Sequence, residues 1–194
     1  MAQIDKLVSI SKKPANPDAF LRPSFSFLNA RSAFKALLQG LELSQDDEVL
    51  LPSYIGWSEY EGSGVFDPIQ EVGMRFSFYR VTRDLMIDFQ DLSFKLATKK
   101  PKLLLLIHYF GYPDPNLEKI ASLAHKAGVY VLEDEAHALF SDWIGGVCGR
   151  FGNAAIFSLH KMLPFESGGM LLLNDSFYTS INERLNNSNL QYSL

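Results

Sequence analysis

The stretch 129–174 constrains the fold and the chemistry of this chain more than any other part of the sequence. It begins with an apolar strand that ends in acidic residues, Val129 to Asp134, and continues through a glycine-rich segment to a second apolar strand, Ala154 to Ser158. Lys161 follows that strand closely, and the pair Gly168-Gly169 opens a third apolar run. Strands that are apolar along their whole length are typical of parallel sheets that are buried on both faces. The stretch therefore predicts part of such a sheet, with an acid and a lysine at neighbouring strand ends.

Upstream of this stretch, apolar strands alternate with amphipathic helices. The predicted strands are 48–51, 75–79 and 103–108, and the predicted helices are 32–41, 88–98 and 116–127. Residues 29–32 suit a helix start and Asp88 suits a cap, while Asp114-Pro115 suits the start of the third helix, which should stop at Gly128. This order predicts an α/β fold: a mixed, mostly parallel sheet with helices on both faces, in which 170–173 is the antiparallel strand.

The domain organisation is predicted to be simple. Residues 1–23 contain three prolines and are interpreted as an N-terminal arm. Residues 24–194 are expected to form one domain, because 194 residues with 47% hydrophobic content suffice for one sizeable core. A last helix is expected at about 177–185, followed by a polar tail.

Composition excludes several classes of function. The net charge is −4 and no cluster of lysine or arginine occurs, which argues against nucleic acid or an anionic membrane as a partner. The single cysteine, Cys148, rules out an internal disulfide and fits a reducing cytoplasm. The most apolar window, 103–107, is far shorter than the roughly 20 residues that span a bilayer. No histidine has the spacing of a metal site, so no metal is expected.

The acid and the lysine suggest a pyridoxal 5'-phosphate (PLP) site. PLP requires a lysine amine for covalent attachment, a carboxylate beside its ring nitrogen, and donors for its phosphate. Lys161, Asp134, Ser158 and the helix start at Ser32 supply these groups. One lysine or aspartate by itself is more often a solvated surface charge. The combination is more specific, because ligands of open α/β sheets bind beyond the carboxyl ends of the strands.

Four motifs in this order resemble the DegT/StrS sugar aminotransferases, which are fold-type I PLP enzymes. These motifs are LEDEAHA, the glycine-rich segment, IFSLHK and GGMLLLND. Upstream, NARSAFKALLQGLELSQDDEVLLPSY resembles the phosphate turn, first helix and following strand of that family, and LLIHYFGYPDPNLEKI resembles its H-x-(Y/F)-G-x-P stretch. The resemblance covers about residues 27–175, which correspond to the large domain of the family.

The resemblance implies roles for individual residues. Lys161 resembles the lysine that holds the cofactor, and Asp134 the acid beside the pyridine nitrogen. Ser158 resembles the phosphate-binding serine, and His137 lies where the family has glutamine or histidine near the ring. The phosphate turn contains Arg31 and Ser32, of which Ser32 is favoured.

An aromatic residue after the strand 48–51 usually stacks on the cofactor ring in this family. Trp57 is preferred to Tyr54 for that role, and either residue could instead belong to the core.

The chain departs from the family pattern in three ways. The family has a separation of five between the serine and the lysine, whereas Ser158 and Lys161 are three apart, which we interpret as a deletion of two residues. His160 precedes Lys161, and some family members use histidine in place of the lysine and dehydrate sugars. The family also has nearly twice this length, so the small domain is expected to be absent from this chain.

The resemblance implies transamination of a nucleotide-linked keto-sugar by an amino-acid donor. It also implies a homodimer whose interface includes the Trp57 loop and the segment 145–152. Without the small domain, apolar surface near 177–185 is expected to be exposed or covered by the arm. Two alternatives remain open: a non-catalytic or truncated PLP-fold domain that binds a partner or metabolite, and a PLP-dependent sugar dehydratase.

Overall fold

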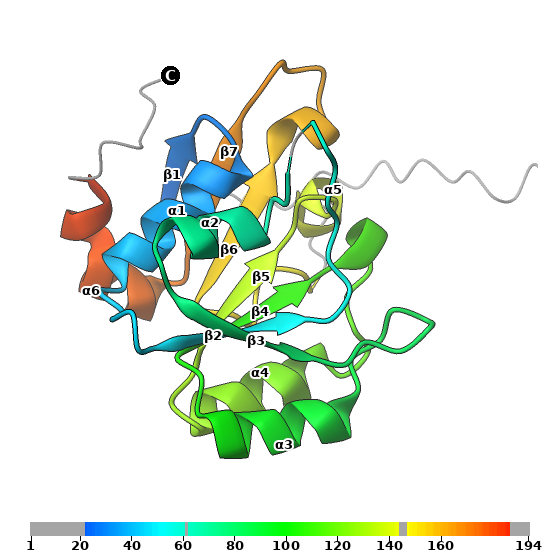
Figure 1. Ribbon diagram of the computed structural model, residues 1–194. Helices are drawn as coiled ribbons and strands as arrows, with labels where there is room; N and C mark the ends of the chain where they lie inside the picture. The colour runs from blue at the N-terminus through cyan, green and yellow to red at the C-terminus, as the bar shows by residue number, and fades with distance from the viewer. Residues whose placement is uncertain (1–21, 61, 144–146, 187–194) are drawn as a thin grey trace, which may run out of the picture.

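The computed structural model describes residues 22–60, 62–143 and 147–186, and its centre is a seven-stranded sheet (Figure 1). The strands lie in the order β1-β7-β6-β5-β4-β2-β3. Neighbours from β3 to β6 pair in parallel, whereas β7 is antiparallel to both β1 and β6. The fold class and the antiparallel strand predicted from the sequence are therefore confirmed. The strand bounds are β1 Ser24–Phe27, β2 Glu48–Pro52, β3 Arg75–Tyr79, β4 Leu103–Ile107, β5 Tyr130–Asp134, β6 Ala154–Ser158 and β7 Gly169–Leu173.

Six α-helices accompany the sheet in the described part of the chain. Their bounds are α1 Ala30–Gly40, α2 Phe66–Glu71, α3 Phe89–Lys99, α4 Leu117–Lys126, α5 Leu139–Trp143 and α6 Asp175–Asn186. Short 3₁₀ turns follow two strands, η2 Tyr109–Gly111 after β4 and η3 Leu159–Lys161 after β6.

The predicted helix starts are partly confirmed. Asn29 caps α1 by accepting from Ser32 N at 2.9 Å, and Asp88 caps α3 by accepting from Asp91 N at 3.0 Å. The predicted start of α4 is wrong by two residues, since Asn116 is its cap residue and the side chain of Asp114 accepts from Asn116 N at 2.8 Å instead. The sequence analysis also missed β1, α2 and α5, each too short for a periodic pattern.

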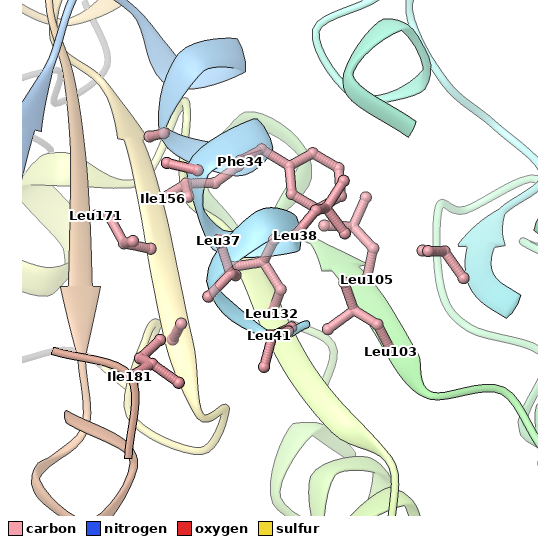
Figure 2. Close-up of a cluster of buried hydrophobic side chains, with 14 of the residues drawn as sticks. Phe34, Leu37, Leu38, Leu41, Leu103, Leu105, Leu132, Ile156, Leu171 and Ile181 are labelled. Carbon is pink, nitrogen blue, oxygen red and sulfur yellow. The ribbon is translucent and has the colours of Figure 1, made fainter. Parts of the chain in front are cut away.

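One face of the sheet packs against α1, α2 and α6. Figure 2 shows α1 side chains meeting strand side chains from β4 to β7, with the labelled contacts formed by residues such as Phe34, Leu37, Leu132 and Ile156. All four side chains are at most 1% exposed. Full burial of one such side chain contributes about 1.5–3 kcal/mol. This face therefore fixes α1 on the sheet.

The opposite face packs against α3 and α4, which Figure 1 shows on the other side of the strands. Side chains of one strand alternate between the two faces. On β5, Val131 belongs to the core on the α3–α4 face and Leu132 to the core on the α1 face. The same alternation directs Glu133 and Asp134 to opposite faces.

The last described helix is part of the main core. Phe177, Ile181 and Leu185 of α6 are buried in the core on the α1 face. Arg184 adds a hydrogen bond to Gly40 O at 3.1 Å. The expectation that the apolar residues of this helix are exposed is therefore wrong, because α1 and the sheet cover them. The N-terminal arm that was expected as their alternative cover, residues 1–23, lies almost wholly outside the described residues. No helix within the described residues is both long enough and apolar enough to cross a membrane.

Candidate active site

A cavity of about 440 Å³ opens at the carboxyl ends of β5 and β6. These strands pair in parallel with Asp134 opposite Ile156, so that Asp134 and Ser158 reach the same edge of the sheet. The cavity brings together six of the seven residues that the sequence analysis predicted for the site: Arg31, Trp57, Asp134, His137, Ser158 and Lys161. The seventh, Ser32, does not line the cavity, and its hydroxyl lies 3.1 Å from Asn29 Oδ1.

Asp134 is the buried acid of this cavity. Its side chain accepts a hydrogen bond from Ala136 N at 2.9 Å, and the residue is 8% exposed. Burial raises the pKa of its carboxyl group, and the Ala136 bond and the charges of Lys161, His108 and His137 oppose this rise. A carboxylate in this environment favours a ligand that brings a positive N–H group.

Lys161 and His160 both reach the cavity because the turn after β6 is tight. Ser158 ends β6 and is only 3% exposed, and η3 begins at the next residue. Leu159 packs on the sheet side, among the apolar residues around Phe157. His160 and Lys161 are left on the side of the cavity, where His160 Nδ1 lies 3.2 Å from Ser158 Oγ.

The N-terminus of α1 forms a second wall. Asn29, Ala30 and Arg31 line the cavity, and α1 approaches β7 closely at Gly169. A Cβ atom at Gly169 would come 2.6 Å from Ala30 N and closer still to the Asn29 carbonyl group, so that only glycine allows this approach. The side chain of Arg31 is 40% exposed and lies 3.8 Å from Asp67 Oδ2. Helix N-termini of this kind favour anions.

Aromatic residues form the outer wall. Trp57 is 72% exposed and Tyr54 is 56% exposed, so neither belongs to the core, and both line the cavity. Tyr109 donates its hydroxyl proton to Tyr54 O at 2.6 Å, which fixes the Tyr54 backbone next to η2. Burial raises the pKa of the Tyr109 hydroxyl well above its usual range.

His137 stacks on Phe110, with ring centres 6.1 Å apart and planes inclined by 12°. Burial lowers the pKa of His137, and the charge of Lys161 lowers it further, whereas Asp134 raises it. The sequence analysis quoted the motif that contains His108, Tyr109 and Phe110 but assigned these residues no place in the site. Their position directly after the strand 103–107 was the signal that could have found them.

Glu133, the neighbour of Asp134, points to the opposite face and is fully buried. Its Oε1 accepts from Phe151 N and Gly152 N at 2.9 and 2.6 Å. Its Oε2 accepts from Gly149 N at 2.8 Å and lies 2.7 Å from His108 Nε2. Ligand atoms of His108, Glu133 and Glu135 lie within 4.8 Å of one another, the spacing of a metal site. The Glu133 oxygens are already used by donors, however, so the group is better described as the anchor of the segment 149–152.

The residues around the cavity fit PLP in their chemistry. A buried carboxylate, a lysine amine, a buried hydroxyl and a helix N-terminus converge on one space, and each corresponds to one functional group of the cofactor. The rise in the Asp134 pKa on burial supports this fit, because a protonated ring nitrogen would relieve the cost of burying the charge.

Comparisons with known proteins identify relatives of this chain in sequence and in fold. GDP-perosamine synthase of Escherichia coli O157:H7 is 29% identical over 150 residues, which are 76% of this chain and 39% of that protein. The aminotransferase TlmJ of Streptoalloteichus hindustanus matches at 27% identity and a TM-score of 0.67, over 83% of this chain and 42% of that one. The E. coli GDP-4-keto-6-deoxy-D-mannose-3-dehydratase, solved with bound hydrated PLP, matches in fold at 22% identity and a TM-score of 0.66, over 83% and 42%. This chain thus spans less than half the length of these relatives. The model of the DegT/DnrJ/EryC1/StrS aminotransferase family matches residues 22–192, and the chain belongs to that family.

Proposed function

We propose that this chain is the PLP-binding domain of an aminotransferase and that it holds the cofactor through Lys161. The observation that carries the proposal is the shared cavity of Lys161 and the buried Asp134 at adjacent strand ends. PLP, when bound, supplies an electron sink for the transfer of an amino group.

The side chains would divide the work as follows. Lys161 would attach the cofactor and would also act as the general acid and base that moves a proton during the transfer. Asp134 would accept a hydrogen bond from the N–H group of the ring nitrogen and so keep that nitrogen protonated. Ser158 would donate to the phosphate. Trp57 or Tyr54 would contact the ring, and His137 would help to hold it. Because Arg31 lines the cavity and Ser32 does not, Arg31 is the better phosphate ligand of the two.

The substrate class proposed for the whole protein is a nucleotide-linked keto-sugar, with an amino acid as the donor. This rests on family membership and on the name of the related GDP-perosamine synthase. We place the protein in the cytoplasm, because the sequence has a single cysteine, Cys148, and therefore no internal disulfide.

The sugar dehydratase is the second candidate, and one observation favours it. His160 lines the cavity beside Lys161, so a histidine is available where that chemistry uses one in place of the lysine.

Covalent PLP binding tests the proposal. The purified protein should turn yellow with PLP, and borohydride reduction should fix the cofactor on the peptide that contains Lys161. The Lys161→Ala variant serves as control and should lose the reducible complex. A colourless protein that borohydride leaves unmodified would overturn the enzyme proposal, and a reversible complex that borohydride does not fix would favour the dehydratase.

We also propose a two-fold homodimer whose interface contains the Trp57 loop. The exposed side chains of Tyr54, Trp57 and Phe110 at the mouth of the cavity support it, since apolar groups gathered on one surface favour contact with a partner. The other predicted part of the interface, 145–152, lies partly outside the described residues. Sedimentation with and without PLP should give a dimer, and a monomer in both conditions would contradict this proposal.

A further inference from the structure

The tight turn directly after β6 creates a side-chain pair at the end of the strand. Ser158 Oγ and His160 Nδ1 lie 3.2 Å apart, and both residues line the cavity. The turn itself is held by Leu159 N, which donates to Gly168 O at 2.9 Å. Gly168 and Leu159 are closely packed in this turn, because a Cβ atom on Gly168 would lie 3.2 Å from Leu159 Cβ. The backbone therefore holds His160 within reach of Ser158.

The bond between these residues can run in either direction. A serine hydroxyl carries one proton, and an imidazole Nδ1 accepts or donates according to its tautomer. A phosphate oxygen without a proton can only accept. If Ser158 donates to such an oxygen, it can no longer donate to His160, and the bond persists only if Nδ1–H of His160 donates to Ser158 Oγ.

We propose that His160 is a positioning residue for a phosphate group in this cavity. Its Nδ1–H donates to Ser158 Oγ and so directs the Ser158 proton at the phosphate. This inference rests on the proposed function, because PLP supplies the phosphate. The near-complete burial of Ser158 strengthens the effect, since water competes poorly for a buried hydroxyl. A chain of two donors also polarises the hydroxyl.

Comparison of PLP with pyridoxal isolates this effect. Pyridoxal has the same ring and aldehyde but lacks the phosphate, so the ratio of the two dissociation constants measures phosphate recognition alone. We expect His160→Ala to lower the preference for PLP over pyridoxal by about tenfold, the range of a hydrogen bond to a charged group. The affinity for pyridoxal should stay unchanged, as read from the absorbance of the bound ligand.

A conservative variant separates positioning from mere packing. The amide Nδ2 of asparagine can replace Nδ1–H as a donor, so His160→Asn should retain most of the preference for PLP. Ser158→Ala should lose the preference as His160→Ala does, and the double variant should lose no more, because the two residues act as one unit. His125→Ala is the matched control: His125 lies 3.1 Å from Asn153 Oδ1 and does not line the cavity.

The outcomes are distinct. A wild-type ratio in His160→Ala overturns the inference and leaves the proposed function intact. A wild-type protein that binds neither ligand overturns both. If His160→Ala does not fold, His160→Leu takes its place, because leucine fills similar space without a donor. A loss equal to that of Ser158→Ala, with no further loss in the double variant, supports the pair, and additive losses overturn it.

Discussion

Glu133 and Asp134 are consecutive buried acids on β5, yet their carboxylates differ in how many hydrogen-bond partners they have. Both oxygens of Glu133 are used by backbone N–H groups of the segment 149–152 and by His108, on the face that packs against α3 and α4. Asp134 has one hydrogen bond of this kind, from Ala136 N, and lines a cavity. We call these the closed acid and the open acid.

One strand thus carries an acid whose partners stabilise the fold and, next to it, an acid that is available to a ligand. A carboxylate that accepts several backbone N–H bonds is stabilised in its charged form and cannot take a new partner without losing an old one. A carboxylate with one bond keeps its capacity for a ligand, at a cost to the protein without ligand. The closed acid should therefore govern folding, and the open acid should govern cofactor binding and rate.

Removal of the closed acid should have the largest effect. Glu133→Ala leaves three backbone N–H groups and His108 without their acceptor, and we expect the free energy of unfolding to fall by about 3–5 kcal/mol. Urea unfolding followed by circular dichroism measures the loss. Asp134→Ala is the matched variant and should cost much less. Equal losses in both variants would abolish the distinction between the two acids.

Neutralisation of the open acid should chiefly affect the rate. Asp134→Asn keeps the shape of the side chain but cannot hold the ring nitrogen protonated, so we expect the amino-group transfer to slow by about a hundredfold, or roughly 3 kcal/mol. The rate is measured from the spectral change of bound PLP on addition of an amino-acid donor. A variant with the wild-type rate would show that Asp134 is a structural acid.

Replacement of glycine by alanine should leave stability unchanged beside the cavity and should lower it beside Glu133. A Cβ at Gly152 would lie 2.9 Å from Val131 O and 3.1 Å from Glu133 Oε1, whereas a Cβ at Gly64 would meet no atom within 4 Å. We expect Gly152→Ala to cost about 1–3 kcal/mol of stability, the range of overpacking, and Gly64→Ala to cost almost nothing. Thermal unfolding of both variants checks this. A stable Gly152→Ala protein would mean that the segment 149–152 has room to shift.

The smallest effect concerns pH. Burial raises the pKa of Asp134 above its ordinary value of 3.8, so the folded protein binds this proton more tightly than the unfolded chain does. The stability of the protein without PLP should then decline as the pH rises from about 3.8 through the folded pKa, because the unfolded state releases the proton first. Subtraction of the same curve for Asp134→Asn isolates this contribution. A difference that does not change over this range, or that has the opposite sign, would contradict the assignment.

Much of the fold was predictable because its signals are local. The bounds of β3 and β6 agree with the sequence prediction, and Asn29 and Asp88 cap helices through bonds that reach only three residues along the chain. The starts and ends of long apolar patterns need no knowledge of the rest of the molecule. β1 was missed because its four residues are held by pairing with β7, which is distant in the sequence.

For the site, the sequence by itself determined which side chains follow which strands, and hence that Asp134, Ser158 and Lys161 reach one edge of the sheet. It also determined that Glu133 and Asp134 point to opposite faces, since alternation is a property of any strand. Only the tertiary structure decided which face holds the cavity, because that depends on where the N-terminus of α1 lies against Gly169. The choice of Arg31 over Ser32 as a cavity residue, and the contact between Ser158 and His160, have the same origin. Each depends on the rotation of a helix or the course of a turn, and packing between distant segments sets both.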